Sequence, residues 1–342
     1  MKDIRDYSLL AHNTFGIDAK CRRFLEYSSV EEAQQMVAEL TPDDQPLLIL
    51  GGGSNLLLTG DYKGTVIHSA IKGIKVLDNE KLHSSDSVFL SCGSGEVFDD
   101  VVAYAVEHGY HGAENLSIIP GEVGESAVQN IGAYGVEAKD IIYKVEAVEI
   151  ATGKVVVFDN QDCQYSYRQS RFKHEWKDKY LVTHVIYRLS KHFVPDLDYG
   201  NIRTSLAAKK IGNPTAQQLR DVIIEIRNAK LPDPKVQGNA GSFFMNPIVQ
   251  KAKYEELAAL YPGMPHYTID AEHEKIPAGW MIDQCGWKGQ SLGRAGVHDK
   301  QALVLVNRGG ATGQEIVNLC ETIRKDVKQK FGIDIHPEVN VK

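Results

Sequence analysis

Cysteine is scarce in this chain of 342 residues, which contains only five of them. The cysteines are odd in number and widely spaced, which matches neither a zinc site nor a disulfide framework, so we expect no bound metal. We interpret the five as reduced thiols of a cytoplasmic protein. They are Cys21, Cys92, Cys163, Cys285 and Cys320.

The chain also lacks an excess of basic residues and any long apolar run. Its net charge of -7 argues against a nucleic-acid partner, which would require a basic face. No stretch is long and apolar enough to cross a bilayer, so we expect no membrane insertion. The first six residues, Met1 to Asp6, contain no apolar core, and we therefore expect no secretory signal. The length predicts two or three domains.

Periodic segments indicate a mixture of helices and strands. Apolar residues at helical spacing predict helices at about 30–40, 97–108, 219–228 and 314–330. Buried or alternating runs predict strands at 46–50, 145–150, 155–158 and 181–188, with a closing strand that contains 336–339. The strands are short and do not alternate regularly with helices, which favours an α+β fold over a doubly wound sheet.

A glycine-rich stretch, residues 118–135, fits neither period. Gly121, Gly124, Gly132 and Gly135 punctuate it, and Pro120 stands near its start. Glycine permits positive φ and the close approach of a ligand. A long surface loop is the simpler interpretation, but this stretch is rich in Val, Ile and Ala, and structureless loops of this length are uncommon unless they are functional. We therefore interpret it as a ligand-binding segment.

A second glycine motif, Gly51-Gly52-Gly53-Ser54-Asn55, directly follows a buried strand. Strand, glycine turn and hydroxyl together resemble a phosphate-binding nest. The motif is neither a Walker sequence nor a dinucleotide fingerprint, because the lysine, the glycine spacing and the following helix are absent. A glycine-rich hairpin remains the alternative.

Several motifs in order along almost the whole chain resemble the family of UDP-N-acetylenolpyruvoylglucosamine reductase, the flavin enzyme also called UDP-N-acetylmuramate dehydrogenase. The length and the Tyr199-Gly200 segment resemble the longer of two family types. Each motif alone is weak, whereas the ordered set is specific. The motifs are Gly51 to Asn55, Ile119-Pro120-Gly121 through Tyr134-Gly135, Tyr167-Arg168-Gln169-Ser170, Gly238 to Phe244, Gln301 to Leu305, and Pro337-Glu338-Val339.

The resemblance implies a flavoprotein fold of the vanillyl-alcohol-oxidase/PCMH type. Two α+β subdomains would hold FAD, at residues 1–66 and 67–225, and the closing strand at 331–342 would return to the second of them. Residues 226–330 would form an α+β substrate-binding domain.

The resemblance also implies an activity, the NADPH-dependent reduction of an enolpyruvyl sugar nucleotide to UDP-N-acetylmuramate for peptidoglycan synthesis. Hydride from flavin N5 adds to the terminal carbon, so that negative charge grows on the next carbon and its carboxylate. Ser242 matches the family's proton donor, and Arg168 and Glu338 match residues that stabilise the intermediate. Without the resemblance, Ser242 would be read as a turn serine and the other two as surface charges.

The family pattern extends to residues that bind the two ligands. We expect FAD to be held non-covalently and the protein to act as a cytoplasmic monomer on its UDP-sugar. The expected FAD residues are Gly51, Gly52, Gly53, Ser54, Asn55, Pro120, Gly121, Gly124, Gln129, Asn130, Gly132 and Ala133. The expected substrate residues are Tyr167, Tyr199, Lys230, Asn246 and Gln301.

Two other functions are compatible with parts of this pattern. A related flavin oxidase would act on a sugar or alcohol and use oxygen. A sugar-nucleotide-binding protein that has lost its cofactor would have no use for Ser242, Arg168 and Glu338 together. Lys230 has an ordinary explanation as a lysine that ends a helix. Met245 stands where many relatives carry lysine, which weakens the assignments at the diphosphate.

Overall fold

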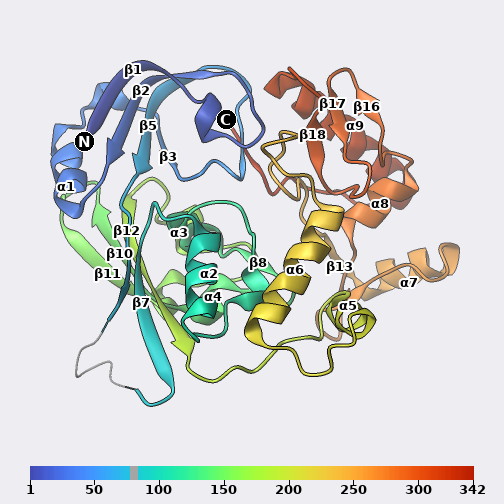
Figure 1. Cartoon of the computed structure of the whole chain (residues 1–342). Coiled ribbons are helices and arrows are strands. Elements are labelled where there is room, and N and C mark those ends of the chain that lie inside the picture. The colour runs from blue at the N-terminus through green and yellow to red at the C-terminus, as the bar shows by residue number, and fades with distance from the viewer. Residues whose placement is uncertain (78–83) are drawn as a thin grey trace. The chain divides into compact units, whose positions relative to one another are not determined.

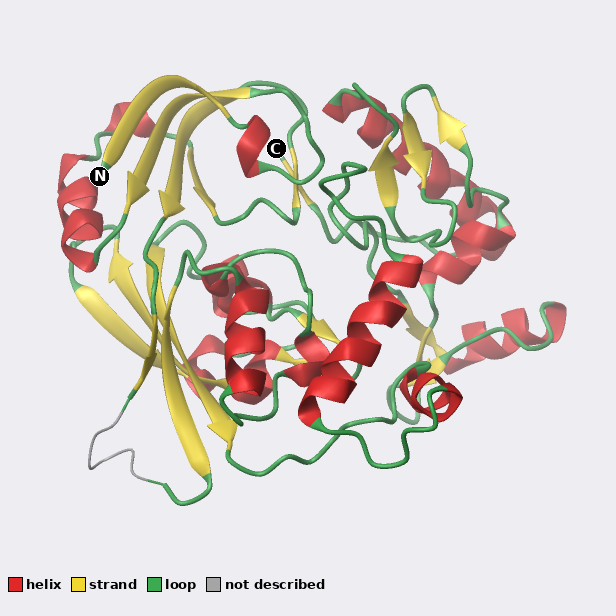
Figure 2. Cartoon of the chain, in the orientation of Figure 1, coloured by secondary structure: helices red, strands yellow, loops and turns green. Residues whose placement is uncertain are grey.

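A computed structural model describes residues 1–77 and 84–342 and divides them between two units (Figure 1). Unit 1 comprises Met1–Tyr7, Cys21–Gly52 and Lys63–Ala229. Unit 2 comprises Ser8–Lys20, Gly53–Tyr62 and Lys230–Lys342. Both units mix strands with helices (Figure 2), which confirms the predicted α+β class.

The first sheet has four strands in the order β1-β2-β5-β3, and β3 runs parallel to β5. Helix α1 begins after Ser29, whose hydroxyl accepts a hydrogen bond from the Glu32 N–H at 3.2 Å. Apolar side chains of α1 pack with those of the sheet in one buried cluster. The elements are β1 (Lys2–Ser8), β2 (Lys20–Tyr27), α1 (Val30–Glu39), β3 (Leu47–Leu50) and β5 (Tyr62–Ser69).

The second sheet lies in unit 1 and has five antiparallel strands in the order β11-β10-β12-β7-β6. The predicted hairpin is confirmed, with Val148 paired to Val155 at its closed end. The predicted strand at 181–188 is the centre of β12. The elements are β6 (Ile74–Val76), β7 (Ser87–Gly93), β10 (Ile142–Glu149), β11 (Val155–Asp159) and β12 (Tyr180–Ser190).

Three helices bury their apolar sides against this sheet: α2 (Phe98–Glu107), α3 (Val123–Gln129) and α4 (Ala138–Ile141). In α2, every buried side chain belongs to one helical face, which explains why the periodicity predicted it correctly. The helix ends before Gly109, which adopts φ +71° as a residue following a helix often does.

Helix α3 corrects one of our predictions, because we expected neither helix nor strand in residues 118–135. The Glu122 N–H donates to the Glu125 carboxylate at 2.9 Å, which supports the first turn. The Ser126 hydroxyl contacts the Tyr187 hydroxyl of β12 at 2.6 Å. Seven residues with an internal glycine are too few, and too poor in helix propensity, for periodicity to reveal the helix.

The end of the same stretch forms a small hairpin of β8 (Gly132–Ala133) and β9 (Val136–Glu137). Between α3 and this hairpin, Asn130 adopts the left-handed conformation with φ +48°. The glycine-rich stretch is therefore ordered by its own short elements and by its contacts with the sheet.

Helices α5 (Ile202–Ala208) and α6 (Ala216–Lys230) share a small apolar cluster. The buried Arg220 of α6 makes a two-pronged contact with Asp99 of α2, with N···O distances of 2.7 and 2.9 Å. Asp99 also accepts the Ile118 N–H at 2.6 Å. One carboxylate thus fixes both α6 and the start of the glycine-rich stretch.

Unit 2 contains two three-stranded sheets, ordered β13-β15-β14 and β16-β17-β18. Its longest helix, α9, begins at a capping box of Thr312 and Glu315 and ends at Gly332 in the left-handed conformation. The elements are β13 (Ile248–Gln250), α7 (Lys251–Leu260), β14 (Tyr267–Thr268), β15 (His273–Lys275), α8 (Ala278–Gln284), β16 (Ser291–Leu292), β17 (Ala295–Val297), β18 (Leu305–Asn307) and α9 (Gly313–Phe331).

The last strand, β19 (Asn340–Val341), pairs in parallel with β4 (Leu56–Leu57), so its strand partner lies in the segment predicted as the first FAD subdomain. The predicted closing strand at 336–339 contributes one isolated bridge, between Pro337 and Phe244. The predicted domain borders near residues 67 and 226 stay predictions.

None of the helices in the described part of the chain combines the length and the apolar composition that a membrane crossing requires.

Candidate active site

Ser242 and Glu338 lie on neighbouring backbone segments of unit 2. The Glu338 N–H donates to the Phe243 carbonyl at 2.8 Å, and the Met245 N–H donates to the His336 carbonyl at 2.9 Å. These two bonds flank the bridge between Phe244 and Pro337. Ser242 is exposed and Glu338 is half-buried. The structure therefore places on neighbouring backbone segments two residues that are almost one hundred positions apart in sequence.

Buried neighbours fix the position of Ser242. Phe243 and Phe244 are each 1% exposed, and their rings meet edge to face at 5.2 Å. Before the serine, Gly241 adopts φ +68°, and its N–H donates to the side chain of the buried Asn239 at 2.9 Å. Ser242 thus lies between a turn that Asn239 fixes and two phenylalanines that are buried. These contacts explain why the motif contains glycine before the serine and aromatic residues after it.

Two predicted substrate residues also lie in unit 2. The Asn246 side-chain oxygen accepts the Ala278 N–H at 2.9 Å, at the start of α8. The Gln301 side-chain oxygen accepts the Leu303 N–H at 3.3 Å. In Asn246 and Gln301 alike, the hydrogen bond to the side-chain oxygen fixes the orientation of the amide group and leaves its N–H groups outside this bond.

Asn55 connects the first glycine motif to the tail of unit 2. Its side-chain amide donates to the Glu338 carbonyl at 3.3 Å, and its own carbonyl accepts the Asn340 N–H at 3.1 Å. Gly53 of the same motif has φ +66°, and a Cβ there would lie 2.0 Å from the His12 carbonyl oxygen. Only glycine fits this position.

Arg168 lies in unit 1, at the tip of a tight turn that we call the arginine turn (residues 166–169). Its φ is +57°, which is uncommon for a residue with a long side chain. The guanidinium donates to the Gly132 carbonyl at 2.6 Å and to the Asn130 carbonyl at 3.4 Å. It also lies 5.2 Å from the centre of the Tyr167 ring. The positive charge is therefore held against the glycine-rich stretch.

The two glycine-rich segments approach each other within unit 1. A Cβ on Gly51 would lie 2.5 Å from the Glu125 side chain, and one on Gly52 would lie 3.4 Å from the Gly121 Cα. The absence of side chains at Gly51 and Gly52 therefore lets this loop pack closely against the start of α3. Glycine-rich backbone of this kind is a common site for a pyrophosphate group.

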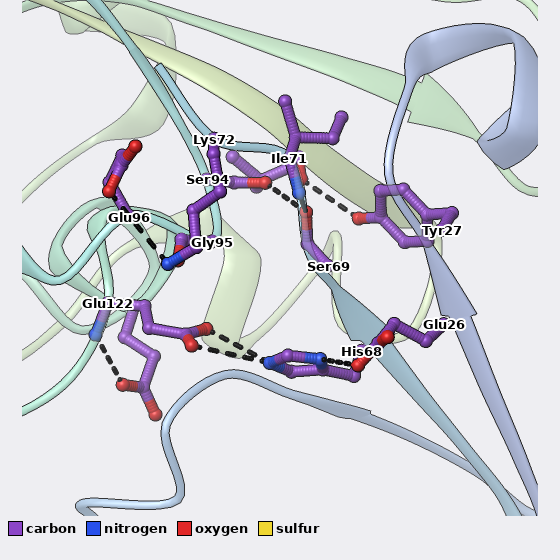
Figure 3. A network of polar contacts seen from close by, with 12 residues as sticks. Glu26, Tyr27, His68, Ser69, Ile71, Lys72, Ser94, Gly95, Glu96 and Glu122 are labelled. Carbon is purple, nitrogen blue, oxygen red and sulfur yellow. Dashed lines mark hydrogen bonds and ion pairs between the residues drawn. The ribbon is translucent and has the colours of Figure 1, made fainter. Parts of the chain in front are cut away.

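A buried polar network adjoins this pair of loops (Figure 3). His68 lies between two carboxylates, 3.0 Å from Glu26 through Nδ1 and 3.3 Å from Glu122 through Nε2. Burial alone would lower the pKa of His68, but the hydrogen bonds and charges of Glu122 and Glu26 outweigh it, so the pKa is raised. Lys2 contacts Glu26 at 2.5 Å. No sequence motif indicated this network.

The remaining predicted residues lie in different environments. Tyr199 is 41% exposed in unit 1, and its ring meets that of Tyr134 at 6.3 Å. Lys230 is exposed at the end of α6. Gln129 contacts the Lys173 ammonium at 3.3 Å through its side-chain oxygen. Ser54, Gly124 and Ala133 are half-buried, whereas Pro120 is exposed and Asn130 is fully buried.

Sequence reasoning missed Arg227 on α6. Its guanidinium reaches the Ile118 carbonyl at 3.4 Å, and its buried Nε has no acceptor among the described residues. Burial lowers its pKa, whereas the charge of nearby Tyr134 opposes that change. A helix pattern that contains two arginines cannot show which of them is turned inward, so no signal in the sequence would have identified Arg227.

Comparisons with known proteins match the chain over almost its whole length. An FAD-binding domain model matches residues 22–159, and a model of the UDP-N-acetylenolpyruvoylglucosamine reductase C-terminal domain matches residues 233–342. The chain is 56% identical to a UDP-N-acetylenolpyruvoylglucosamine reductase of Bacteroides fragilis and 47% identical to one of Porphyromonas gingivalis. Each alignment covers 98% of this chain and 98% of the relative.

A solved structure supports the fold. The crystal structure of UDP-N-acetylenolpyruvylglucosamine reductase from Thermus caldophilus matches with a TM-score of 0.66 at 21% identity. The match covers 99% of this chain and 98% of that one. The predicted fold of an FAD-binding domain followed by a C-terminal domain is confirmed.

Proposed function

The chain belongs to the UDP-N-acetylenolpyruvoylglucosamine reductase family, and from this premise we propose how its residues perform the reaction. It is an FAD-dependent oxidoreductase that reduces UDP-N-acetylenolpyruvoylglucosamine to UDP-N-acetylmuramate in peptidoglycan synthesis, with NADPH as the electron donor. The roles of individual residues in that reaction are our proposal.

Backbone of the glycine motifs holds the cofactor in this proposal. When bound, FAD accepts hydride from NADPH and supplies it to the terminal carbon of the enolpyruvyl group. The backbone N–H groups of Gly51 and Gly52 bind the pyrophosphate, and the lack of side chains at these positions lets their loop pack against Gly121 and Glu125. In the adjoining stretch, Pro120, Gly121, Gly124, Gln129, Gly132 and Ala133 line the rest of the cofactor.

Arg168 stabilises the charge that develops on the substrate. Addition of hydride leaves negative charge on the carbon beside the carboxylate, and a fixed cation lowers the energy of that state. Two backbone carbonyls, those of Gly132 and Asn130, orient the guanidinium before the substrate arrives. A cation that is already in place does not have to reorient during the reaction, whereas water molecules around the same charge would have to do so.

Ser242 donates the proton that completes the reduction, and Glu338 assists at the same carbon. Serine is a poor acid in water, so the donor requires neighbours that stabilise its alkoxide. The observation that supports this pair is the backbone pairing of 243–245 with 336–338, which holds both residues on adjacent segments of unit 2. A hydroxyl and a carboxyl group held in this way suit proton transfer to a carbanion.

Five further residues bind the UDP-sugar in this proposal. Asn246 and Gln301 offer side-chain amides whose orientation the protein already fixes. The exposed Lys230 ammonium meets the diphosphate, and the aromatic rings of Tyr167 and Tyr199 cover the nucleotide. We also propose a cytoplasmic monomer without a nucleic-acid partner, which the net charge of -7 supports.

The test is Ser242→Ala, examined separately in each half-reaction. We expect NADPH to reduce the bound flavin at the wild-type rate, because that step needs no proton from Ser242. Reoxidation by the enolpyruvyl sugar should slow by roughly 10²–10⁴-fold, the usual effect of losing a positioned acid.

Ser291→Ala is the matched control, since Ser291 is an exposed serine of β16 in the same unit. Both of its half-reactions should keep wild-type rates. Equal slowing of both half-reactions in Ser242→Ala would show that the serine is not the proton donor.

A further inference from the structure

Asn130 is a fully buried residue at the end of α3, within the segment predicted to line the flavin. Its backbone is left-handed, with φ +48°. A residue in this conformation commonly ends a helix, and glycine or asparagine usually fills the position. That explanation accounts for the backbone alone and leaves the side chain unexplained.

The side-chain amide of Asn130 is engaged on every side. Its nitrogen donates to the Ser166 carbonyl at 2.8 Å and to a Glu137 carboxylate oxygen at 3.0 Å. Its oxygen accepts the Lys139 N–H at 3.0 Å. An amide has two N–H donors, so both are used within the protein. The side chain is therefore not available as a hydrogen-bond donor to a cofactor.

The Ser166 carbonyl belongs to the arginine turn. The Ser166 N–H donates to the Gln169 carbonyl at 3.1 Å, and the Gln169 N–H donates back to the Ser166 carbonyl at 2.9 Å. Two residues, Tyr167 and Arg168, form the tip between them. The Ser166 carbonyl thus accepts two hydrogen bonds, one from the Gln169 N–H within the turn and one from the Asn130 side-chain amide.

The Arg168 side chain in turn contacts the backbone of Asn130. The Arg168 guanidinium donates to the Asn130 backbone carbonyl at 3.4 Å and to the Gly132 carbonyl at 2.6 Å. Asn130 therefore contacts both the start of the turn, through its side chain, and the charged end of Arg168, through its backbone. Since Arg168 has a positive φ, which a long side chain rarely adopts, the turn needs such external contacts to persist.

We propose that Asn130 is a positioning residue that holds the arginine turn so that the Arg168 guanidinium faces the reacting substrate. This inference rests on the proposed function, because it requires Arg168 to stabilise charge on the substrate. It replaces the expectation that Asn130 binds FAD. The effect of Asn130 should therefore appear in the step that uses Arg168 and not in cofactor retention.

Two substitutions separate the side chain from the backbone. Asn130→Gly keeps the left-handed backbone at little cost and removes the amide. Asn130→Asp keeps the shape but turns a carboxylate oxygen toward the Ser166 carbonyl and the Glu137 carboxylate. We expect both variants to bind FAD stoichiometrically, with a wild-type absorption spectrum and a wild-type rate of reduction by NADPH. At saturating enolpyruvyl sugar, reoxidation should slow by about 10- to 100-fold, the effect expected of a misplaced catalytic group.

A double variant shows whether Asn130 acts through Arg168. Arg168→Met should slow reoxidation, and adding Asn130→Gly to it should cause no further loss, because the group being positioned is already gone. Asn160→Asp is the matched control. Its amide nitrogen, like that of Asn130, donates to two acceptors, here the backbone carbonyls of Lys139 and Ile142 at 2.9 and 2.8 Å. It lies outside the arginine turn and should keep the wild-type reoxidation rate.

Four results would overturn the inference, and they are distinguishable. Loss of FAD from a folded Asn130→Gly protein would restore the role of cofactor ligand. Independent, multiplicative losses in the double variant would show that Asn130 does not act through Arg168. A wild-type reoxidation rate in Asn130→Gly, beside a slow Arg168→Met, would refute the positioning role alone. If Arg168→Met itself reoxidised normally, the proposed function of Arg168 and the inference would fail together.

Discussion

Gly132 lies directly beneath the guanidinium of Arg168, so a single added methyl group tests whether that charge must be held in place. A Cβ at Gly132 would lie 2.9 Å from Arg168 Nη1, 2.9 Å from the Val136 carbonyl oxygen and 3.0 Å from Glu137 Cγ. The Val136 carbonyl belongs to the paired strand of the small hairpin and has little freedom to move. The guanidinium is the end of a flexible side chain, so we expect Gly132→Ala to displace it.

The cost follows from the contact that is lost. The bond from Arg168 Nη2 to the Gly132 carbonyl measures 2.6 Å, and hydrogen bonds to charged groups contribute about 1.5–3 kcal/mol. Because about 1.4 kcal/mol corresponds to a tenfold change in rate, reoxidation by the enolpyruvyl sugar should slow by roughly 10- to 150-fold. Crowding should also lower the free energy of unfolding by about 1–3 kcal/mol.

The assay is anaerobic stopped-flow of each half-reaction in the flavin-loaded protein. Reduction by NADPH should stay within about twofold of wild type. Gly212→Ala is the control, since a Cβ at Gly212 meets no atom within 4 Å and its φ is not positive. A folded Gly132→Ala protein with a wild-type reoxidation rate would refute the claim that a fixed Arg168 stabilises the developing charge.

Two further predictions concern stability. Gly53→Ala places a side chain on a residue with positive φ, and its Cβ would lie only 2.0 Å from the His12 carbonyl oxygen. The free energy of unfolding should therefore fall by about 2–4 kcal/mol, as measured by denaturant titration. An unchanged midpoint would contradict this prediction. Glu122 and Glu26 raise the pKa of His68 in the folded protein. The stabilisation that these carboxylates give is therefore fully present below the unfolded pKa of about 6.5, and it is lost as the pH rises through the folded pKa. His68→Gln should therefore lower the melting temperature more at pH 6 than at pH 9, and an equal loss at both values would show that the ion pairs contribute nothing.

Long amphipathic helices were predicted well because their signal repeats over several turns. The predicted helix at 314–330 is observed as α9 (Gly313–Phe331), and its buried residues recur at helical spacing. The predicted helix at 219–228 is part of α6 (Ala216–Lys230). Helix α3 was missed because seven residues supply fewer than two clear repeats, and its glycine lowers helix propensity.

The candidate site was less accessible to pattern reasoning. Ser242, Arg168 and Glu338 could be proposed only from family resemblance, because each residue alone has an ordinary explanation as a turn or surface residue. The burial of Asn130 and of the Arg227 Nε atom depends on tertiary contacts, which periodicity does not encode. The network around His68 joins residues that are 42 and 54 positions apart, and short motifs cannot indicate such pairs.

The most direct test of the account is the visible spectrum of the purified protein, recorded without oxygen during two successive additions. NADPH should bleach the yellow of the bound flavin, and the UDP-enolpyruvyl sugar should then restore it with formation of UDP-N-acetylmuramate. A flavin that NADPH bleaches but the sugar leaves bleached would contradict the proposed reaction. A protein that takes up no FAD would contradict the role given to the two glycine motifs.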